Sequence, residues 1–345
     1  MSESKYPAQI LITGGAGFIG SNIVKILRER YPLSKLRILH LPQENLLNLN
    51  GLDGLEMMSG DITNSADVTH AVNGCDVVFH LAAVYAFWLP DMSIMHRVNV
   101  GGTRLVLEEC LKQKVQRVVY TSSIARFTGQ GLETISDESS PFSMGESVYS
   151  QSKYDSHLVA EEFARRGLDV VIVCPAVPMG PGDVGPTPSG RMVTDIFRFP
   201  APLAVRSEIN IIDVRDCAMG HVLALEKGRT GESYILGGEN YTYADMLRRV
   251  LRLCGIKRPI IELPPVILNP IAVGLTLIAS ITGRPPLVTP VEVSLAKSGM
   301  LVNAEKARRE LGLTVRPLEQ TLRDALAWFT ANGYIKESVA RMQRQ

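Results

Sequence analysis

Residues 13–20 read Thr13-Gly14-Gly15-Ala16-Gly17-Phe18-Ile19-Gly20 and are the strongest indication of the fold class. This stretch follows the apolar run at 10–13 and leads directly into a helical pattern at 18–30, so it predicts a strand, a glycine-rich turn and a helix. Gly14 permits the tight turn, Gly17 lets the backbone approach a pyrophosphate, and Gly20 allows the helix to pack against the strand. The helix N-terminus supplies unpaired N–H groups and a positive dipole end for phosphates. The pattern therefore predicts a dinucleotide site near the start of the chain.

Outward from this turn, the first half of the chain alternates short β-branched runs with helical periodicity. We expect strands near 10–13, 36–41, 55–58, 76–81, 117–120 and 169–174, and helices near 18–30, 66–72, 95–113 and 150–166. Residues 170–174 read VVIVC, the uniformly apolar composition of a parallel strand that is buried on both faces. The predicted fold class is therefore α/β, a Rossmann-type, doubly wound parallel sheet.

The second half of the chain differs from the first in composition and in periodicity. Residues 175–202 are rich in Pro and Gly and show no sustained period, which is typical of a long functional loop. Beyond it we expect strands at 209–212 and 233–236, and helices near 217–226, 243–254, 304–311 and 317–332. We predict that residues 1–175, joined by some later segments, form the nucleotide-binding domain. Residues 176–345 then form mainly a smaller α/β substrate-binding lobe over the carboxyl edge of the sheet.

Composition limits the class of protein and its compartment. The 345 residues are 46% apolar and 21% charged, enough for a large core plus a smaller lobe, which excludes a disordered chain. The formal net charge is +1 without a dense basic run, so we expect no nucleic-acid partner. The five cysteines lie far apart without a CxxC pair, which argues against a metal site or a disulfide framework. The N-terminus lacks the apolar core of a signal peptide, and we expect a cytoplasmic protein.

One segment raises the question of a membrane. No charge occurs between Glu262 and Arg284, and residues 266–281 are strongly apolar. The run is interrupted by Pro264, Pro265, Asn269 and Pro270. Because the uninterrupted part is shorter than the roughly 20 residues of a spanning helix, we expect no membrane span. Two alternatives stay open: one or two helices that cover an apolar cleft, and peripheral contact with a membrane.

Several further motifs occur in order after the glycine turn. They are Gly60-Asp61-Ile62, His80-Leu81-Ala82-Ala83, Asn99-Val100-Gly101-Gly102-Thr103, Thr121-Ser122-Ser123, Tyr149-Ser150-Gln151-Ser152-Lys153 and Pro175 to Gly180-Pro181. With this glycine spacing, the chain resembles the extended short-chain dehydrogenase/reductases of the NAD-dependent epimerase/dehydratase family. The resemblance implies a nicotinamide cofactor, NAD or NADP. Its expected contacts are Gly14, Gly17, Phe18, Ile19, Gly20, His40, Asp61, Ile62, Leu81, Ala82, Ala83, Tyr149, Lys153 and Pro175.

The choice between the two cofactors stays open. An acidic residue at the end of the second strand favours the free ribose hydroxyl of NAD, and an arginine favours the phosphate of NADP. This chain has His40 there, which is neither.

Tyr149 and Lys153 are four residues apart, so on a helix both side chains project from one face. A neighbouring ammonium and a positive nicotinamide ring favour the phenolate, and lowering the tyrosine pKa by about three units requires roughly 4 kcal/mol. The resemblance implies that Tyr149 exchanges a proton with the substrate oxygen and that Lys153 holds the nicotinamide ribose. It also implies that Ser123, rather than its neighbour Ser122, donates a hydrogen bond to the same oxygen. These three residues, Ser123, Tyr149 and Lys153, are the predicted catalytic set.

Within this branch, the chain is similar to dihydroflavonol-reductase-like proteins and to hopanoid-associated sugar epimerases. The similarity rests on Ala83-Val84-Tyr85, the loop at 180–191, the stretch at 213–221 and residues 235–240. Dehydratases of the family carry Asp-Glu where this chain has Ser122 and Ser123, so elimination is not expected. The arginine that clamps a nucleotide-sugar diphosphate is replaced by Ile209. The predicted substrate contacts are Tyr85, Ser123, Thr187 and Arg191.

Three functions stay open at this point. The first is reduction or oxidation at a ketone or secondary alcohol of a largely apolar molecule, the second is epimerisation of a sugar with tightly held NAD, and the third is nucleotide sensing without catalysis. The apolar segment and the missing arginine favour the first, and the presence of both Tyr149 and Lys153 argues against the third. The helices at 95–113 and 150–166 occupy the places where many relatives form a homodimer, although a monomer stays open.

Overall fold

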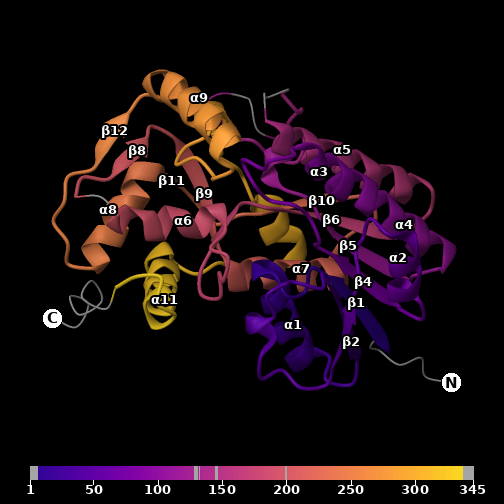
Figure 1. Ribbon diagram of the computed structural model, residues 1–345. Helices are drawn as coiled ribbons and strands as arrows, with labels where there is room; N and C mark the ends of the chain where they lie inside the picture. Colours follow the sequence, from indigo (N-terminus) through magenta and orange to yellow (C-terminus); the bar gives the residue numbers. More distant parts are fainter. Residues whose placement is uncertain (1–6, 128–130, 132, 144–146, 199, 337–345) are drawn as a thin grey trace.

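The computed structural model describes residues 7–127, 131, 133–143, 147–198 and 200–336. Seven strands, all paired in parallel, form its main sheet in the order β10-β6-β5-β4-β1-β2-β3 (Figure 1). Their bounds are β1 Gln9–Thr13, β2 Lys35–His40, β3 Leu55–Ser59, β4 Val77–His80, β5 Arg117–Thr121, β6 Val170–Pro175 and β10 Ser233–Leu236. The strand order reverses between β1 and β4, which confirms the predicted Rossmann-type fold.

Helices cover both faces of this sheet. On one face, α1 (Phe18–Arg30) packs against α7 (Val214–Lys227), and on the other lie α2 (Ser65–Val72), α4 (Thr103–Lys112) and α5 (Val148–Arg165) (Figure 1). Every residue of β6 is buried, because helices cover it from both sides. Since α7 and β10 follow residue 175, the second half of the chain completes the sheet and one of its helical layers. The predicted division at residue 175 allowed for such returning segments and stays a prediction.

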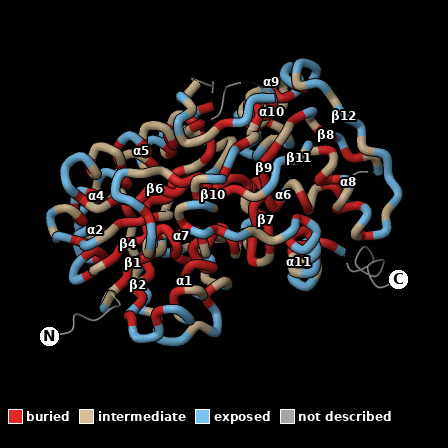
Figure 2. The backbone as a smooth tube through the Cα atoms, turned by 180° about the vertical axis from the view of Figure 1, so that it is seen from behind, coloured by how far each residue is buried: buried red, intermediate tan, exposed pale blue. Residues whose placement is uncertain are grey.

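A second apolar core lies beside the first, and we call the elements around it the smaller lobe. Its strands are β7 (Val177–Met179), β9 (Glu208–Asp213) and β11 (Glu239–Thr242) in one sheet, and β8 (Leu203–Val205) with β12 (Ile261–Leu263) in another. Its helices are α6 (Pro188–Thr194), α8 (Tyr243–Leu253), α9 (Pro265–Thr282), α10 (Pro290–Ser298) and α11 (Leu318–Ala331). Figure 2 shows buried residues both in the main sheet with its helices and in the smaller lobe.

Several elements differ from the sequence prediction. The expected loop at 175–202 holds β7, α6 and the 3-10 turn η4 (Asp195–Phe197). Helix α6 forms because the Thr187 side chain caps it and Pro188 occupies the first turn, where a missing N–H costs nothing. The helix expected at 95–113 is divided into α3 (Ser93–His96), a π-helical segment η2 (Arg97–Gly102) and α4.

Other short elements had no clear sequence pattern. Strands β8, β11 and β12 were not predicted, because each is three or four residues long and β11 is mostly exposed. The helix predicted at 304–311 ends in the π-helical segment η5 (Ala307–Leu311). The remaining short turns are η1 (Leu47–Leu49) and η3 (Ile124–Arg126).

The uncharged segment forms the single helix α9, with Pro265 in its first turn and Pro270 inside it. Pro270 lacks one backbone donor, yet the helix continues past it for three turns. By length and composition alone, α9 could cross a membrane: its mean hydropathy is 1.8, and 22% of it is buried. It is the one helix among the described residues that meets these criteria.

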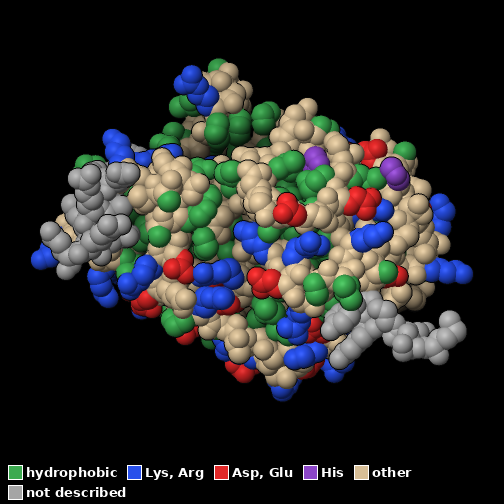
Figure 3. Space-filling model, turned by 90° about the horizontal axis from the view of Figure 1, so that it is seen from below, with side chains coloured by type: hydrophobic (Ala, Val, Ile, Leu, Met, Phe, Trp, Pro, Cys, Tyr) green, Lys and Arg blue, Asp and Glu red, His purple; other side chains and the backbone are tan. Residues whose placement is uncertain are grey.

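Charged side chains are interspersed over the face of the molecule shown in Figure 3. The five cysteines are all buried and free, as their apolar surroundings in the sequence predict. In the described part of the chain, no three His, Cys, Asp or Glu side chains converge into a group that could hold a metal ion.

Candidate active site

The glycine turn lies against the loop that follows β4. Gly14 has a φ of +70°, which favours glycine, and a Cβ built there would lie 2.9 Å from the backbone nitrogen of Ala82. At Gly20 a Cβ would lie 2.2 Å from the Gly14 carbonyl oxygen. Thr13 Oγ1 accepts hydrogen bonds from the backbone nitrogens of Leu81 and Ala82, each at 3.2 Å. The carboxyl ends of β1 and β4 are therefore held together by backbone packing that has no room for larger residues.

The outer side of this turn fits an anionic group. Gly17 is the N-cap of α1, and no side chain caps the helix, so the N–H groups of the first turn, including those of Phe18 and Ile19, have no side-chain acceptor. The first turn contains no acidic residue. A Cβ built at Gly17 would meet one atom within 4 Å, the Gly14 carbonyl oxygen at 3.2 Å. Free donors, a positive helix end and open space are what a pyrophosphate needs.

His40 is the last residue of β2, and Asp61 lies two residues after β3 at the same edge of the sheet. His40 Nδ1 lies 2.9 Å from the Leu41 carbonyl oxygen, which directs the ring along its own loop. The carboxylate of Asp61 accepts hydrogen bonds from both the backbone nitrogen and the hydroxyl of Thr63, each at 2.8 Å. Both side chains keep partial exposure, so each stays available to a ribose or an adenine.

The remaining predicted cofactor contacts lie along the adjoining strands. Ile62 is buried, and a Cβ built at Gly102 would lie 2.6 Å from its Cδ1. The Ile62 side chain therefore packs directly against the backbone of η2. Leu81, Ala82 and Ala83 follow β4, and Pro175 ends β6. The structure therefore brings the predicted positions to one edge of the sheet.

Tyr149 and Ser123 lie side by side at the end of β5. Tyr149 is in the first turn of α5, and its hydroxyl donates a long hydrogen bond of 3.5 Å to Ser123 Oγ. Ser123 caps η3, where its Oγ also accepts the backbone N–H of Ala125 at 3.1 Å. Both side chains are partly exposed. The two hydroxyls therefore form a pair that a substrate oxygen can reach.

Ser122 faces a different environment. Its Oγ lies 2.9 Å from Nδ1 of the buried His157, whose Nε2 lies 3.2 Å from Ser233 Oγ. Successive residues of extended backbone point to opposite sides, so the two serines diverge. The structure brings Ser123, and not Ser122, to Tyr149.

Lys153 lies one helical turn after Tyr149 and is almost completely buried. Its Nζ donates to the Thr121 carbonyl oxygen at 3.0 Å and lies 5.6 Å from the centre of the Tyr120 ring. Burial lowers the pKa of Lys153 to about 8. The amine is therefore held in place by the end of β5, with a proton that it can lose near neutral pH.

The pKa of Tyr149 differs from the sequence prediction. Burial raises the pKa of Tyr149 to about 12, and the hydrogen bond with Ser123 opposes the rise. The sequence prediction combined the Lys153 ammonium with a nicotinamide charge. The protein's own groups alone do not lower this pKa, because desolvation of the phenolate outweighs the other effects. The contribution of a nicotinamide charge stays a prediction.

Aromatic side chains form a wall beside Tyr149. The Tyr85 ring centre lies 5.0 Å from that of Tyr149, and the Phe87 ring meets Tyr149 edge-on at 6.2 Å. Desolvation raises the pKa of Tyr85 above its usual range, and the Arg191 charge opposes this rise. Two predicted substrate contacts, Tyr85 and Ser123, therefore gather around Tyr149, and the contact of Arg191 with a substrate stays a prediction.

Thr187 is the predicted substrate contact whose hydroxyl has other partners. Its Oγ1 donates to Asp183 at 2.7 Å and accepts the backbone N–H of Gly190 at 3.4 Å. The side chain therefore organises the start of α6, and its contact with a substrate stays a prediction.

Sequence reasoning assigned no role to Asn99, although it lies in one of the quoted motifs. Its side chain exchanges two hydrogen bonds with the backbone of Val84, at 2.7 and 3.1 Å, and donates to Ser152 Oγ at 3.0 Å. Ser152 Oγ in turn donates to the carbonyl oxygen of Tyr149 at 2.8 Å. Asn99 therefore ties the loop after β4 to the first turn of α5. Phe87 was also missed, because no pattern distinguishes it from a core residue.

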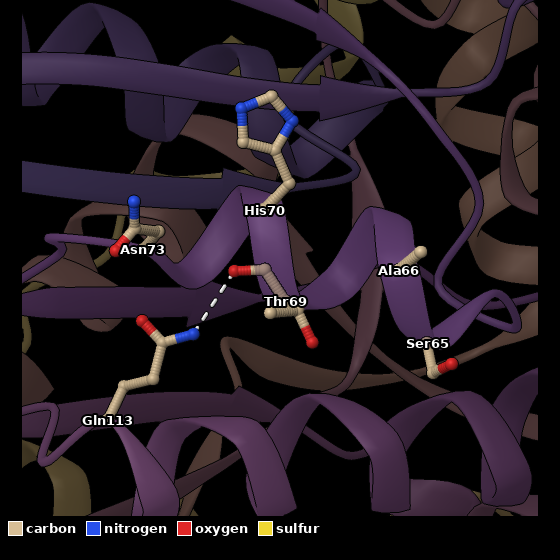
Figure 4. Close-up of a pocket in the computed structure, with 6 residues that line it drawn as sticks. All are labelled: Ser65, Ala66, Thr69, His70, Asn73 and Gln113. Carbon is tan, nitrogen blue, oxygen red and sulfur yellow. Dashed lines mark hydrogen bonds between the residues drawn. The ribbon is translucent and has the colours of Figure 1, made fainter.

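A surface hollow between α2 and α4 lies outside this site (Figure 4). Its volume is about 450 Å³, and Gln113 spans it with a hydrogen bond from Nε2 to the Thr69 carbonyl oxygen at 3.1 Å. The other lining residues are Ser65, Ala66, His70 and Asn73. None of them belongs to the predicted site, so the hollow adds nothing to its chemistry.

Known proteins are similar to this chain in both sequence and fold. The NAD dependent epimerase/dehydratase family model matches residues 10–237. A protein of Synechocystis sp. (strain ATCC 27184 / PCC 6803 / Kazusa), named "Putative dihydroflavonol 4-reductase", is 36% identical over 94% of this chain and 95% of its own length. Sterol demethylase protein B of Methylococcus capsulatus is 32% identical over 94% of this chain and 99% of its own length. The crystal structure of gox2253 is 36% identical, with a TM-score of 0.83 over 95% of this chain and 100% of its own.

Proposed function

The chain belongs to the NAD dependent epimerase/dehydratase family and is an enzyme of that family, and from this premise we propose its reaction. The reaction is hydride transfer at a ketone or secondary alcohol carbon of a largely apolar small molecule, with Tyr149 as the acid/base. The observation that carries this proposal is the pair formed by the Tyr149 hydroxyl and Ser123 Oγ, 3.5 Å apart at the carboxyl edge of the sheet. When bound, NAD or NADP supplies a hydride to a carbonyl carbon or accepts one from an alcohol carbon.

The protein's donors and its close backbone packing indicate how the cofactor is held. The N–H groups at the start of α1 would bind the pyrophosphate, and His40 and Asp61 would contact the adenosine part. Lys153 and the residues that follow β4 and end β6 lie toward the nicotinamide end.

In the reducing direction, Tyr149 donates its proton to the substrate oxygen. Because burial raises its pKa to about 12, the hydroxyl carries its proton at neutral pH. Ser123 donates a second hydrogen bond to the same oxygen and stabilises the charge that develops there. In the oxidising direction Tyr149 takes the proton back from the substrate hydroxyl.

Several observations support a largely apolar substrate. Tyr85 and Phe87 line the approach to Tyr149. Ile209 is buried in the core of the smaller lobe, so the place of a diphosphate-binding arginine is filled by an aliphatic side chain. The names of two similar proteins refer to a dihydroflavonol and a sterol, and neither refers to a nucleotide sugar.

A second candidate is an epimerase that oxidises a sugar and reduces it again on the opposite face. The observation that favours it is Arg191, an exposed cation of α6 whose guanidinium suits a phosphate group. Such an enzyme returns its cofactor to the starting state and has no need to release it.

One experiment separates the two candidates. The purified protein is tested for bound nicotinamide by absorbance and mass spectrometry, and then for turnover of added NADH or NADPH with a panel of apolar ketones. The proposal expects exchangeable cofactor and consumption of the reduced form with at least one ketone. Stoichiometric cofactor that does not exchange, together with interconversion of sugars, would instead identify the epimerase.

We also propose an assembly, a compartment and a membrane contact for this protein. A homodimer through α4 and α5 is supported by the position of these helices on one outer face of the sheet. The five free, buried cysteines support a reducing compartment such as the cytoplasm. Peripheral contact with a membrane is supported by the exposed surface of α9.

A further inference from the structure

We infer that the exposed face of α9 docks the protein onto the surface of an anionic lipid bilayer, with the helix lying in the interface. This inference does not rest on the proposed reaction. We define the docking face by its seven aliphatic side chains: Val266, Ile267, Ile271, Val273, Leu277, Ile278 and Ile281. Each is at least 44% exposed, and Ile281 reaches 87%.

The polarity of α9 is the reverse of that of an ordinary surface helix. At 3.6 residues per turn, the seven side chains cover an arc of about 160°, and the other residues on this arc are Pro270 and Gly274. A helix on the surface of a globular protein normally presents polar and charged residues outward. Here the arc contains no polar side chain, and the exposed Asn269, Ser280 and Thr282 lie outside it, so water is a poor environment for the arc.

The polar residues of α9, which are Asn269, Thr276, Ser280 and Thr282, lie outside this arc, and the hydroxyls of Thr276 and Ser280 are already used. Thr276 Oγ1 donates to the Ala272 carbonyl oxygen at 2.8 Å, and Ser280 Oγ donates to the Thr276 carbonyl oxygen at 3.0 Å. The helix therefore presents few unsatisfied polar groups to an apolar medium.

The opposite side of the helix is fixed to the smaller lobe. Leu268 and Ala272 are buried against Val293 of α10, with Val205 and Leu263 packed around them. Because α9 is attached along its length and both its ends return to the lobe, it does not cross the bilayer. It lies along the outer edge of the lobe (Figure 1), where Figure 2 shows exposed backbone.

The exposed apolar surface continues beyond the helix. Leu203 and Ile261 are neighbours in the pairing of β8 with β12 and are 57% and 45% exposed. They share the strand face of Val205 and Leu263, which pack beneath α9, because side chains two apart on a strand point the same way. The strands therefore extend the apolar surface at the side of the docking face.

Charge complementarity favours an anionic bilayer over the other occupants. Arg284 follows the end of α9, and Arg206 lies at its start, where its backbone nitrogen donates to the Leu263 carbonyl oxygen. Both are exposed, and no ion pair involves either one within the described residues. The acid nearest the helix start, Glu262, is paired with Arg248. Two free cations thus flank an apolar face, as in helices that bind acidic lipid surfaces.

The other occupants fit this face less well. A small substrate cannot cover seven side chains along a helix about 27 Å long. Protein interfaces are enriched in aromatic residues, Met and Arg, whereas this arc carries aliphatic residues, Gly and Pro. A fluid layer of acyl chains accepts such a ridge without shape complementarity.

Vesicle flotation tests the inference with the full-length protein. The probes are vesicles of phosphatidylcholine mixed with phosphatidylglycerol, and vesicles of phosphatidylcholine alone. We expect binding to the anionic vesicles, and the double substitution Leu277→Glu with Ile281→Glu should weaken it roughly tenfold or more, since each charge must enter an apolar layer. Arg206→Gln with Arg284→Gln should remove the preference for phosphatidylglycerol while the docking face stays intact.

The control is Leu33→Glu, which places one Glu at an aliphatic position that is 85% exposed in the turn after α1, and it is compared with the single variant Ile281→Glu as well as with the double variant. It should bind vesicles like the unaltered protein. Circular dichroism and thermal unfolding establish that each variant is folded, and Ile271→Ser provides a milder change on the docking face. Absence of binding to both vesicle types, or equal binding by the double variant, would overturn the inference. So would a dimer in solution that the Glu substitutions convert to a monomer, since the face would then join two copies of the chain.

Discussion

The hydroxyl of Tyr149 lies 3.5 Å from Oγ of Ser123, although the two residues belong to different elements, α5 and the turn that follows β5. Ser123 Oγ also accepts the backbone N–H of Ala125, which leaves its own proton free to be donated. The pair therefore offers two hydrogen-bond donors to one incoming oxygen. Such an arrangement suits a carbonyl oxygen that gains negative charge as a hydride reaches its carbon.

Replacing Tyr149 with Phe removes the proton donor while the ring remains. The contacts with Tyr85 and Phe87 involve the ring, so the aromatic wall should stay in place. We expect turnover to fall by about 10²–10⁴-fold, the usual contribution of a positioned acid or base. Cofactor affinity, measured by fluorescence titration with reduced nicotinamide, should be unchanged. Near-normal turnover in this variant would contradict the assignment.

Ser123→Ala and Ser122→Ala form a matched pair on neighbouring residues. Loss of Ser123 should lower turnover by about 10²-fold, because one donor to the developing charge is removed. Loss of Ser122 leaves Nδ1 of the buried His157 without its partner at 2.9 Å, so the free energy of unfolding should fall by about 1–3 kcal/mol. Turnover per folded molecule should persist in Ser122→Ala. Steady-state kinetics and urea unfolding of both variants distinguish the two roles, and the reverse result would assign catalysis to Ser122.

The buried amine of Lys153 predicts a pH dependence of stability. Its pKa is about 8 in the folded protein, against an ordinary value of 10.5, so between these pH values the unfolded chain binds more protons. Stability therefore rises with pH across this window, and the burial penalty applies in full below about pH 8. Relative to Lys153→Met, which has no such group, the unaltered protein should gain about 3 kcal/mol as the pH rises from 8 to 10.5. Urea unfolding of both proteins at several pH values measures the difference, and parallel curves would show that the amine titrates normally.

The sequence predicts those parts of the fold that depend on local pattern. The glycine turn, the apolar strands and the helix that carries Tyr149 and Lys153 one turn apart all follow from short-range spacing. Strands β8 and β12 could not be found in this way, because residues 203–205 become a strand by pairing with residues 261–263, far along the chain. Likewise, the sequence prediction treats Pro270 as an interruption of the apolar run. In the structure, packing against the smaller lobe holds this segment as one helix.

The electrostatics of the site were harder to predict than its composition. Sequence spacing places a lysine near Tyr149, but it does not reveal how much protein surrounds either group. Burial sets both pKa values, raising that of Tyr149 and lowering that of Lys153. The partners of Ser122 and Asn99 were invisible for the same reason, since His157 and Val84 reach them only in the folded chain.

Gly20 and Gly101 provide a test of the cofactor turn by the same substitution at two glycines. A Cβ at Gly20 would lie 2.2 Å from the Gly14 carbonyl oxygen and 2.8 Å from the Gly15 Cα, so Gly20→Ala must displace the turn or the start of α1. A Cβ at Gly101 meets nothing within 4 Å, so Gly101→Ala should be neutral or stabilise the protein by about 0.5–1 kcal/mol. Added NAD should raise the Tm of the unaltered protein and of Gly101→Ala, because a ligand that binds the folded state stabilises it.

In Gly20→Ala that rise should be lost, together with about 1–3 kcal/mol of stability from the forced backbone shift. A calorimetric scan of each variant with and without NAD measures both effects. If Gly20→Ala folded normally and kept the full rise in Tm, the cofactor could not depend on the backbone geometry of this turn, and the dinucleotide site would have to lie elsewhere.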